Sequence, residues 1–172
     1  MDVKVPCKEP PAVADELARL VESFVSPGAE LLIDAYGGAG FFAKRLLHKF
    51  ERVVGIEWDR FAVAAAQAEA APNETYIAGD VERELQQQLL AATLSTTCVI
   101  VDPPATGLSE TTRRALLDHS PATLIYVSCN PPTLARDLAQ LQQRFTIESI
   151  TPLDMFPQTA EIEVATHLRA SA

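Results

Sequence analysis

Residues 30–58 read ELLIDAYGGAGFFAKRLLHKFERVVGIEW, and this stretch decides the fold. The apolar run at 30–36 predicts a strand, which is followed at once by a glycine-rich turn. The stretch FFAKRLLHKF at 41–50 predicts a helix, and RVVGIEW at 52–58 predicts a second strand. A strand, a crossover helix and another strand at this spacing indicate a unit with two parallel strands.

The same alternation continues along the rest of the chain. It predicts further strands at 74–80, 96–104, 122–130, 145–156 and 162–170, and further helices at 10–25, 60–71, 81–94, 108–120 and 132–145. No helix separates the last two strands, so we expect the final strand to run antiparallel. We therefore predict one domain over 1–172, with α/β fold class. A Rossmann-like, seven-stranded core would span 29–172, and an N-terminal extension and helix would span 1–28.

Composition places the chain among ordinary globular proteins. Of its 172 residues, 48% are hydrophobic and 22% are charged. No apolar run reaches the roughly 20 residues that span a bilayer. The first residues, MDVKVPCKEPPAVADELARL, lack the apolar core of a signal peptide. We therefore expect a cytoplasmic protein that does not interact with membranes.

Charge and cysteine content narrow the choice of partners. The net charge of -9 argues against this chain alone gripping a nucleic-acid backbone, which favours surfaces rich in Lys and Arg. An RNA substrate stays open, because basic residues can gather on one face or on a separate domain. Cys7, Cys98 and Cys129 form no CxxC pair, which disfavours a disulfide framework or a zinc or iron–sulfur site. We expect no metal.

Three elements at predicted strand ends point to a cofactor site. The run DAYGGAG at 34–40 lets the backbone turn tightly, but it matches neither G-x-G-x-x-G nor G-K-[ST], so a cofactor without phosphate fits better. Glu57 ends the second strand, where a carboxylate can accept both ribose hydroxyls. Asp80 ends the third strand, where it can hold an adenine amino group. Their order favours S-adenosylmethionine (SAM), whose methyltransferases also end on an antiparallel strand. An NAD-type cofactor is the main alternative.

Candidate catalytic groups follow the later strands. Asp102 opens a D-P-P turn, as is common in nucleic-acid methyltransferases, although a simple strand-end turn would read the same way. Cys129 lies between a strand and a helix start, where the helix dipole favours the thiolate. Cys98 lies inside an apolar strand and is expected to be a small buried residue. Glu163 shares a strand face with Glu161, and its alternative interpretation is a solvated edge charge.

The chain resembles the SAM-dependent RNA 5-methyluridine methyltransferases over roughly residues 10 to 170. The motifs that carry the resemblance are DAYGGAGFF, GIEWD, VDPPATGL, YVSCNPPTLARDL and LDMFPQTAEIEV. The most specific signal is SCNP followed by MFPQT-x-x-x-E. The resemblance implies the same SAM-dependent methyltransferase fold, SAM as cofactor, and tRNA or rRNA as substrate.

The resemblance also implies a role for individual residues. Tyr36 and the backbone from Gly38 to Phe41 would contact the methionine part of SAM, and Glu57 would hold the ribose. Asp102 would line the pocket shared by SAM and the target base.

Cys129 would then be the nucleophile and Glu163 the general base. Carbon 5 of uracil is a poor nucleophile, but a thiolate that adds to carbon 6 generates an enolate that is nucleophilic at carbon 5. After methylation a base removes the proton from carbon 5, and elimination frees the cysteine. The target base must be reachable, which implies base flipping or a loop substrate.

Several departures from the family pattern keep other functions open. Ala105 stands where the family usually has Arg, Glu161 stands where it has His, and PCKEP stands where a SAM-binding Gln is expected. The family's N-terminal RNA-binding domain has no counterpart in the sequence, so RNA binding can require a separate domain. The alternatives are a non-catalytic SAM-binding module, either a pseudoenzyme or a fragment, and a methyltransferase that acts on another target through Asp102 alone.

Overall fold

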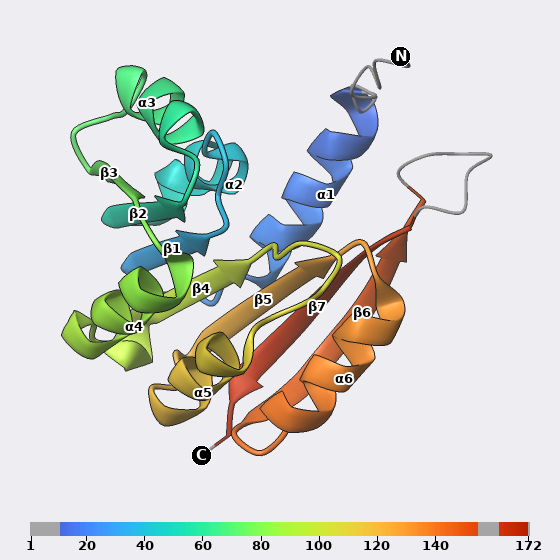
Figure 1. The fold of residues 1–172 in the computed structure, drawn as a ribbon. Coiled ribbons are helices and arrows are strands. Elements are labelled where there is room, and N and C mark those ends of the chain that lie inside the picture. The colour runs from blue at the N-terminus through green and yellow to red at the C-terminus, as the bar shows by residue number, and fades with distance from the viewer. Residues whose placement is uncertain (1–10, 155–161, 172) are drawn as a thin grey trace, which may run out of the picture.

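A computed structural model describes residues 11–154 and 162–171. They form one seven-stranded sheet with helices on both faces (Figure 1). The strands are β1 (Leu31–Ala35), β2 (Arg52–Glu57), β3 (Glu74–Ala78), β4 (Thr97–Val101), β5 (Thr123–Ser128), β6 (Phe145–Leu153) and β7 (Glu163–Ala170). The helices are α1 (Pro11–Phe24), α2 (Phe41–Leu46), α3 (Arg60–Ala68), α4 (Val81–Ala91), α5 (Glu110–Asp118) and α6 (Pro131–Leu141), with 3-10 turns at Leu47–Lys49 and Leu94–Thr96.

The strand order is β3-β2-β1-β4-β5-β7-β6. Strands β1 to β5 pair in parallel, and β7 runs antiparallel between β5 and β6. This confirms the predicted α/β, Rossmann-like sheet with an antiparallel last strand. The order reverses between β1 and β4, and ligands of such sheets bind beyond the carboxyl ends of the strands at this switch point.

Two apolar layers cover the sheet. Successive strand residues point to opposite faces, so Leu32 and Ile33 of β1 are both fully buried but lie in different layers. Ile33 packs in the layer that includes Leu116 of α5, together with α4 and α6. Leu32 packs in the layer that includes Phe42 of α2, together with α1 and α3. The continuous apolar run in β4 is buried at every position, as the sequence predicts.

Polar caps start four of the helices at the carboxyl edge of the sheet. The side chains of Asp59, Asp80, Ser109 and Asn130 each accept a hydrogen bond from a backbone N–H in the first turn of the helix that follows. Such a cap satisfies a donor that has no partner within the helix. The positive ends of these helices therefore lie along the edge where the candidate site residues are found.

The predicted elements differ from the observed ones mainly at their ends. The helix predicted over 41–50 ends at Leu46 and continues as a 3-10 turn. The strand predicted over 96–104 ends at Val101, because two prolines follow that cannot donate to a ladder. Some of the sequence predictions concern residues outside the described ones. These are residues 155–156 of the sixth predicted strand, the Pro-Gln-Thr segment, Glu161, and the stretch 1–10 with Cys7.

Candidate active site

A tight loop joins β1 to α2 at the centre of the carboxyl edge. Gly38 has φ 53° and Gly40 has φ 85°, values that glycine adopts without strain. Tyr36 is the one non-glycine residue of the described chain with positive φ, at 65°. Such backbone outliers gather at functional sites, where the surrounding structure holds them. A Cβ atom added to Gly38 would meet nothing within 4 Å, so the loop presents bare backbone to open space there.

A buried carboxylate supports this loop from below. Asp34 is fully buried, and its Oδ2 accepts a hydrogen bond from the Ala43 N–H at 3.0 Å. A Cβ atom at Gly37 would lie 3.1 Å from this carboxylate, so the glycine is needed for the close approach. Burial raises the pKa of Asp34 to about 7, although the bond from Ala43 opposes the rise. Its Oδ1 has no hydrogen-bond partner among the described residues.

A second carboxylate fixes the loop from the side. Glu57 ends β2, and its Oε2 accepts a hydrogen bond from the Gly38 N–H at 3.1 Å. Its Oε1 accepts from the Asp59 N–H at 2.9 Å. A carboxylate offers about four acceptor positions, so both oxygens can still accept ligand hydroxyls. Glu57 is therefore oriented between the glycine loop and the start of α3.

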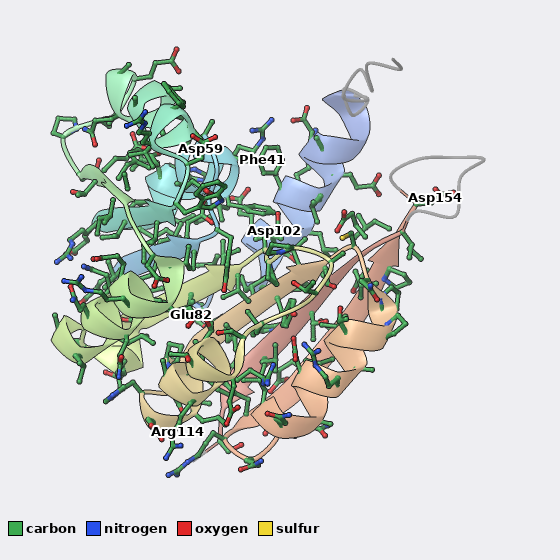
Figure 2. The ribbon with its side chains drawn as sticks, in the orientation of Figure 1. Phe41, Asp59, Glu82, Asp102, Arg114 and Asp154 are labelled. Carbon is green, nitrogen blue, oxygen red and sulfur yellow. The ribbon has the colours of Figure 1, made fainter. Side chains whose placement is uncertain are left out.

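Two cavities open beside the loop, and Tyr36 lines both of them. The smaller has a volume of about 280 Å³. The larger has a volume of about 580 Å³. Among the lining residues of the smaller are Gly38, Phe41, Asp102, Val127 and Glu163. Those of the larger include Trp58, Asp80 and Pro104. Figure 2 shows Phe41 from α2 and Asp102 from the loop after β4 on the same edge of the sheet.

Phe41 is a braced wall of the smaller cavity. The guanidinium of Arg45 lies 4.0 Å from the centre of the Phe41 ring, in a cation–π contact. Arg45 also forms an ion pair with Asp15 of α1 at 3.4 Å. Phe42 packs edge-on against the same ring, with the ring centres 4.8 Å apart. The ring is thus held between α1 and α2, beside the cavity.

Cys129 directly follows β5, and Glu163 is the first residue of β7, which runs antiparallel to β5. Ser128, the last residue of β5, pairs with Val164 of β7. Cys129 directly follows Ser128, and Glu163 directly precedes Val164, so both adjoin the last pair of this register. Cys129 is exposed, and α6 starts two residues later at Pro131. The structure therefore places the thiol at a helix start and at the side of the strand that contributes Glu163 to the smaller cavity.

The structure brings most, but not all, of the predicted site residues into the two cavities. The smaller cavity gathers Tyr36, Gly38, Phe41, Asp102 and Glu163, and the larger gathers Tyr36 and Asp80. Glu57 and Cys129 line neither cavity. Glu57 lies behind the loop that it fixes, and Cys129 lies on the exposed strand end beside the smaller cavity. The chemical roles of all eight residues stay predictions.

Sequence reasoning missed two residues of this edge. Trp58 is 77% exposed and lines the larger cavity. Its position directly after Glu57, at the carboxyl end of a predicted strand, is the sequence signal that points to it. Asp34 was treated as part of the glycine run, and its burial beneath that run depends on tertiary structure.

Neither a metal centre nor a membrane span is found in the described part of the chain. Within residues 11–154 and 162–171, no three His, Cys, Asp or Glu side chains are grouped so that they could hold a metal ion. Over the same residues, no helix has the length and apolar character needed to cross a bilayer. The site is thus described by its carboxylates, aromatic rings, thiol and backbone amides.

Comparison with known proteins identifies the family. The family model "tRNA (Uracil-5-)-methyltransferase" matches residues 12–171. A protein named "tRNA (uracil(54)-C(5))-methyltransferase" from Pyrococcus furiosus is 38% identical, over 91% of this chain and 36% of its own length. An "Uncharacterized RNA methyltransferase" from Lactobacillus johnsonii is 41% identical, over 81% of this chain and 31% of its own length.

Solved structures agree with the sequence comparisons. The crystal structure of Pyrococcus abyssi tRNA (uracil-54, C5)-methyltransferase in complex with S-adenosyl-L-homocysteine is similar, with a TM-score of 0.76 and 33% identity. The match covers 90% of this chain and 38% of that one. The chain thus spans about a third of the length of the relatives it matches. On the strength of the model match, the chain belongs to the tRNA (uracil-5-)-methyltransferase family.

Proposed function

We propose that this chain is the catalytic domain of a SAM-dependent RNA methyltransferase that methylates carbon 5 of uridine. The observation that carries the proposal is the end of the β5–β7 pairing, where Cys129 adjoins Ser128 and Glu163 adjoins Val164, the partner of Ser128. Glu163 lines a cavity together with Asp102. Family membership supports the same reaction. We propose further that residues 1–172 form a single methyltransferase domain, with 1–28 as its N-terminal extension and helix.

The two cavities fit a nucleoside joined to an amino acid, as in SAM. The larger offers the Trp58 ring and the Asp80 carboxylate to an adenine, and the smaller offers bare backbone at Gly38 to the methionine part. In this proposal Glu57, which lies behind the loop and bonds to the Gly38 and Asp59 N–H groups, accepts the ribose hydroxyls. The S-adenosyl-L-homocysteine bound to the Pyrococcus abyssi relative supports this assignment. When bound, SAM supplies the methyl group.

The remaining chemistry falls to the residues of β5 and β7. In this proposal the Cys129 thiolate adds to carbon 6 of the target uracil, and the resulting enolate carbon 5 accepts the methyl group. Glu163 then takes the proton from carbon 5, and the bond between carbon 6 and sulfur breaks to regenerate the thiolate. Asp102 lies between the cofactor loop and the strand end of Cys129, where it can contact the target base.

The substrate is proposed to be a uridine in tRNA or rRNA, and the names of the relatives favour tRNA. A chain with net charge -9 neutralises few phosphates by itself. We therefore infer that a separate RNA-binding domain strengthens the complex, and that the protein works in the cytoplasm, where its substrate is found. Fusing the chain to a basic RNA-binding domain is expected to lower the RNA concentration needed for half-maximal methylation, without changing the rate at saturation.

One experiment tests the proposed reaction. The chain is mixed with SAM and RNA that contains 5-fluorouridine. This base carries fluorine in place of the carbon-5 proton that must be removed, so the covalent adduct persists on a denaturing gel. We expect an adduct with the native chain and none with Cys129→Ala. The matched control is Cys98→Ala, which alters a buried thiol of β4 and is expected to keep the adduct. Calorimetric titration with S-adenosylhomocysteine is expected to show binding by all three proteins.

The other outcomes favour the alternative functions. Binding of S-adenosylhomocysteine without any adduct or methyl transfer would indicate a non-catalytic SAM-binding module. Methylation that survives Cys129→Ala would indicate a different target, reached through Asp102. A chain that does not bind S-adenosylhomocysteine would contradict the proposal and both alternatives.

A further inference from the structure

A buried carboxylate lies outside both cavities, in the middle of α6. The Asp137 side chain is fully buried. Its Oδ2 accepts hydrogen bonds from the Leu108 backbone N–H and from the Tyr126 hydroxyl, each at 2.8 Å. Its Oδ1 accepts from the guanidinium groups of Arg113 and Arg136, each at 2.9 Å. One carboxylate therefore joins α6 to α5, to β5 and to the loop that follows β4.

The same loop is held on α6 by further contacts. The Thr133 hydroxyl donates to the Ala105 carbonyl at 3.1 Å, and Nη2 of Arg136 donates to the Thr106 carbonyl at 3.0 Å. Gly107, the next residue, has φ 76°, and a Cβ atom there would lie 2.6 Å from the buried carboxylate. Every residue from 105 to 108 is thus fastened to α6 or pressed against it.

The two ends of this assembly are candidate site residues. The loop begins at Asp102, which lines the smaller cavity, and α6 begins two residues after Cys129. A rigid connection between loop and helix therefore fixes Asp102 relative to Cys129. The carboxylate bonds to Leu108, Tyr126, Arg113 and Arg136, so it acts through the elements that it joins.

The network contains more charge than a simple loop anchor needs. The Arg113 side chain is 12% exposed and the Asp137 side chain is fully buried. Desolvating such a pair costs several kcal/mol, so the gain in stability over an apolar contact is small. Burial, together with the hydrogen bond to Asp137, raises the pKa of Tyr126, so that the phenol stays a donor. A fully bonded network of this kind selects one arrangement of loop and helix.

We propose that Asp137 is a positioning residue for the methyl transfer. It holds the loop that starts at Asp102 against the helix that follows Cys129, so that the target base meets the thiol and the methyl-donor cavity in one geometry. The proposal rests on the proposed function, because the positioned thiol matters only if it attacks the base.

The test compares two isosteric substitutions in the full 172-residue chain. Asp137→Asn removes the charge that joins loop and helix. Glu74→Gln is the matched control, because Glu74 is also a buried carboxylate bonded to a tyrosine hydroxyl, that of Tyr76 at 2.7 Å, and to a backbone N–H, that of Ala71 at 2.6 Å. It lies on β3, away from the loop. The readouts are the rate of adduct formation with 5-fluorouridine RNA at saturating RNA and SAM, the affinity for S-adenosylhomocysteine, and the melting temperature.

We expect Asp137→Asn to slow adduct formation on the order of 10- to 100-fold, because a small misplacement of reacting groups has effects of this size. The affinity for S-adenosylhomocysteine is expected to stay unchanged. Glu74→Gln is expected to lower the melting temperature without slowing the adduct. Tyr126→Phe removes the hydroxyl bond to Asp137, and Thr133→Val removes the bond to the Ala105 carbonyl. Both variants are expected to fold and to slow the adduct to a smaller extent. They carry the test if Asp137→Asn does not fold.

Three results would overturn the proposal. Adduct formation at the native rate in Asp137→Asn, or in both milder variants if Asp137→Asn does not fold, would remove the positioning role and leave the proposed function intact. Equal slowing by Glu74→Gln would show that only general stability is involved. A native chain that forms no adduct would contradict the proposed function itself, and the positioning role would fall with it.

Discussion

The two halves of the carboxyl edge are held in different ways. We call residues 34–41, Glu57 and Asp80 the cofactor half, and residues 102–108, Cys129 and Glu163 the target half. In the cofactor half, Asp34 and Glu57 accept hydrogen bonds from backbone N–H groups of the loop and its surroundings. The target half is held by Asp137 of α6, whose carboxylate accepts hydrogen bonds from two guanidinium groups, a phenol and one backbone N–H.

The two halves therefore depend on sequence in different ways. Bonds to backbone amides depend on the shape of the loop, so the cofactor half needs glycine where the chain turns and a carboxylate where the amides point. Bonds to arginine and tyrosine depend on side chains that come from distant parts of the chain. We therefore expect substitutions in the cofactor half to change ligand affinity, and substitutions in the target half to change the rate of the reaction.

Glu163→Gln should give the largest effect and break the target half alone. If Glu163 removes the proton from carbon 5, turnover on uridine RNA is expected to fall on the order of 10²- to 10⁴-fold, while the covalent adduct still forms and accumulates. Methyl-transfer assays and denaturing gels measure the two steps. The control is Glu148→Gln on the neighbouring strand β6, where Glu148 pairs with Arg169 at the surface. A parallel loss of adduct would assign Glu163 to an earlier step.

Glu57→Gln should break the cofactor half. It weakens the acceptor of the Gly38 N–H and removes the charge proposed to hold the ribose, so the affinity for S-adenosylhomocysteine is expected to fall about 10- to 100-fold. Calorimetry measures this loss of affinity. The control is Glu51→Gln, because Glu51 lies just before the start of β2, at the end opposite Glu57. Alkylation of Cys129 by iodoacetamide is expected to proceed at the native rate. Unchanged affinity would rule out the proposed ribose contact.

The buried carboxylate of the cofactor half, Asp34, should make the stability of the chain depend on pH. Burial raises the pKa of Asp34 from 3.8 to about 7, so the folded chain binds more protons than the unfolded chain between these values. The contribution of Asp34 to the free energy of unfolding therefore falls as the pH rises from about 4 to about 7. Asp34→Asn has no such titration. Its free energy of unfolding, relative to that of the native chain, is therefore expected to be a few kcal/mol higher at about pH 8 than at about pH 5. Urea unfolding at both values measures the gain, and a difference that does not vary with pH would refute it.

The helix caps should give the smallest effects. Asp80→Ala and Asn130→Ala each remove one side-chain cap, and each is expected to lower the free energy of unfolding by about 1 kcal/mol. Asp80→Ala is expected to weaken S-adenosylhomocysteine binding as well, whereas Asn130→Ala is expected to slow adduct formation. Both variants losing the same function would erase the division between the two halves.

Much of the fold could be predicted because its signals are local. The β4 strand is apolar at every position after Thr97 and is buried throughout. Ser109 caps the helix that begins at Glu110, as its position in the sequence predicts. The two consecutive strands at the end predicted the antiparallel strand that the structure confirms. The exact ends were less predictable, because a side chain cannot show in advance where a neighbouring strand stops.

The site was predictable to a lesser extent. Phe41, Asp102 and Glu163 are far apart in sequence. Phe41 begins α2, Asp102 follows β4 and Glu163 begins β7, so the topology brings all three to one cavity at the carboxyl edge. Glu57 behind the glycine loop and Cys129 outside both cavities differ from the simple expectation that all site residues line one space. Their positions depend on how the loop folds back over the strand ends.

The sequence by itself determined the alternation of strands and helices, the glycine-rich turn, and the thiol between a strand and a helix start, because each depends on neighbours within a few residues. Only the tertiary structure decided that Asp34 is buried beneath the turn and that Asp137 joins α5, β5 and α6 to the loop at 105–108. The physical reason is that burial and long-range hydrogen bonds exist only after distant segments have packed together.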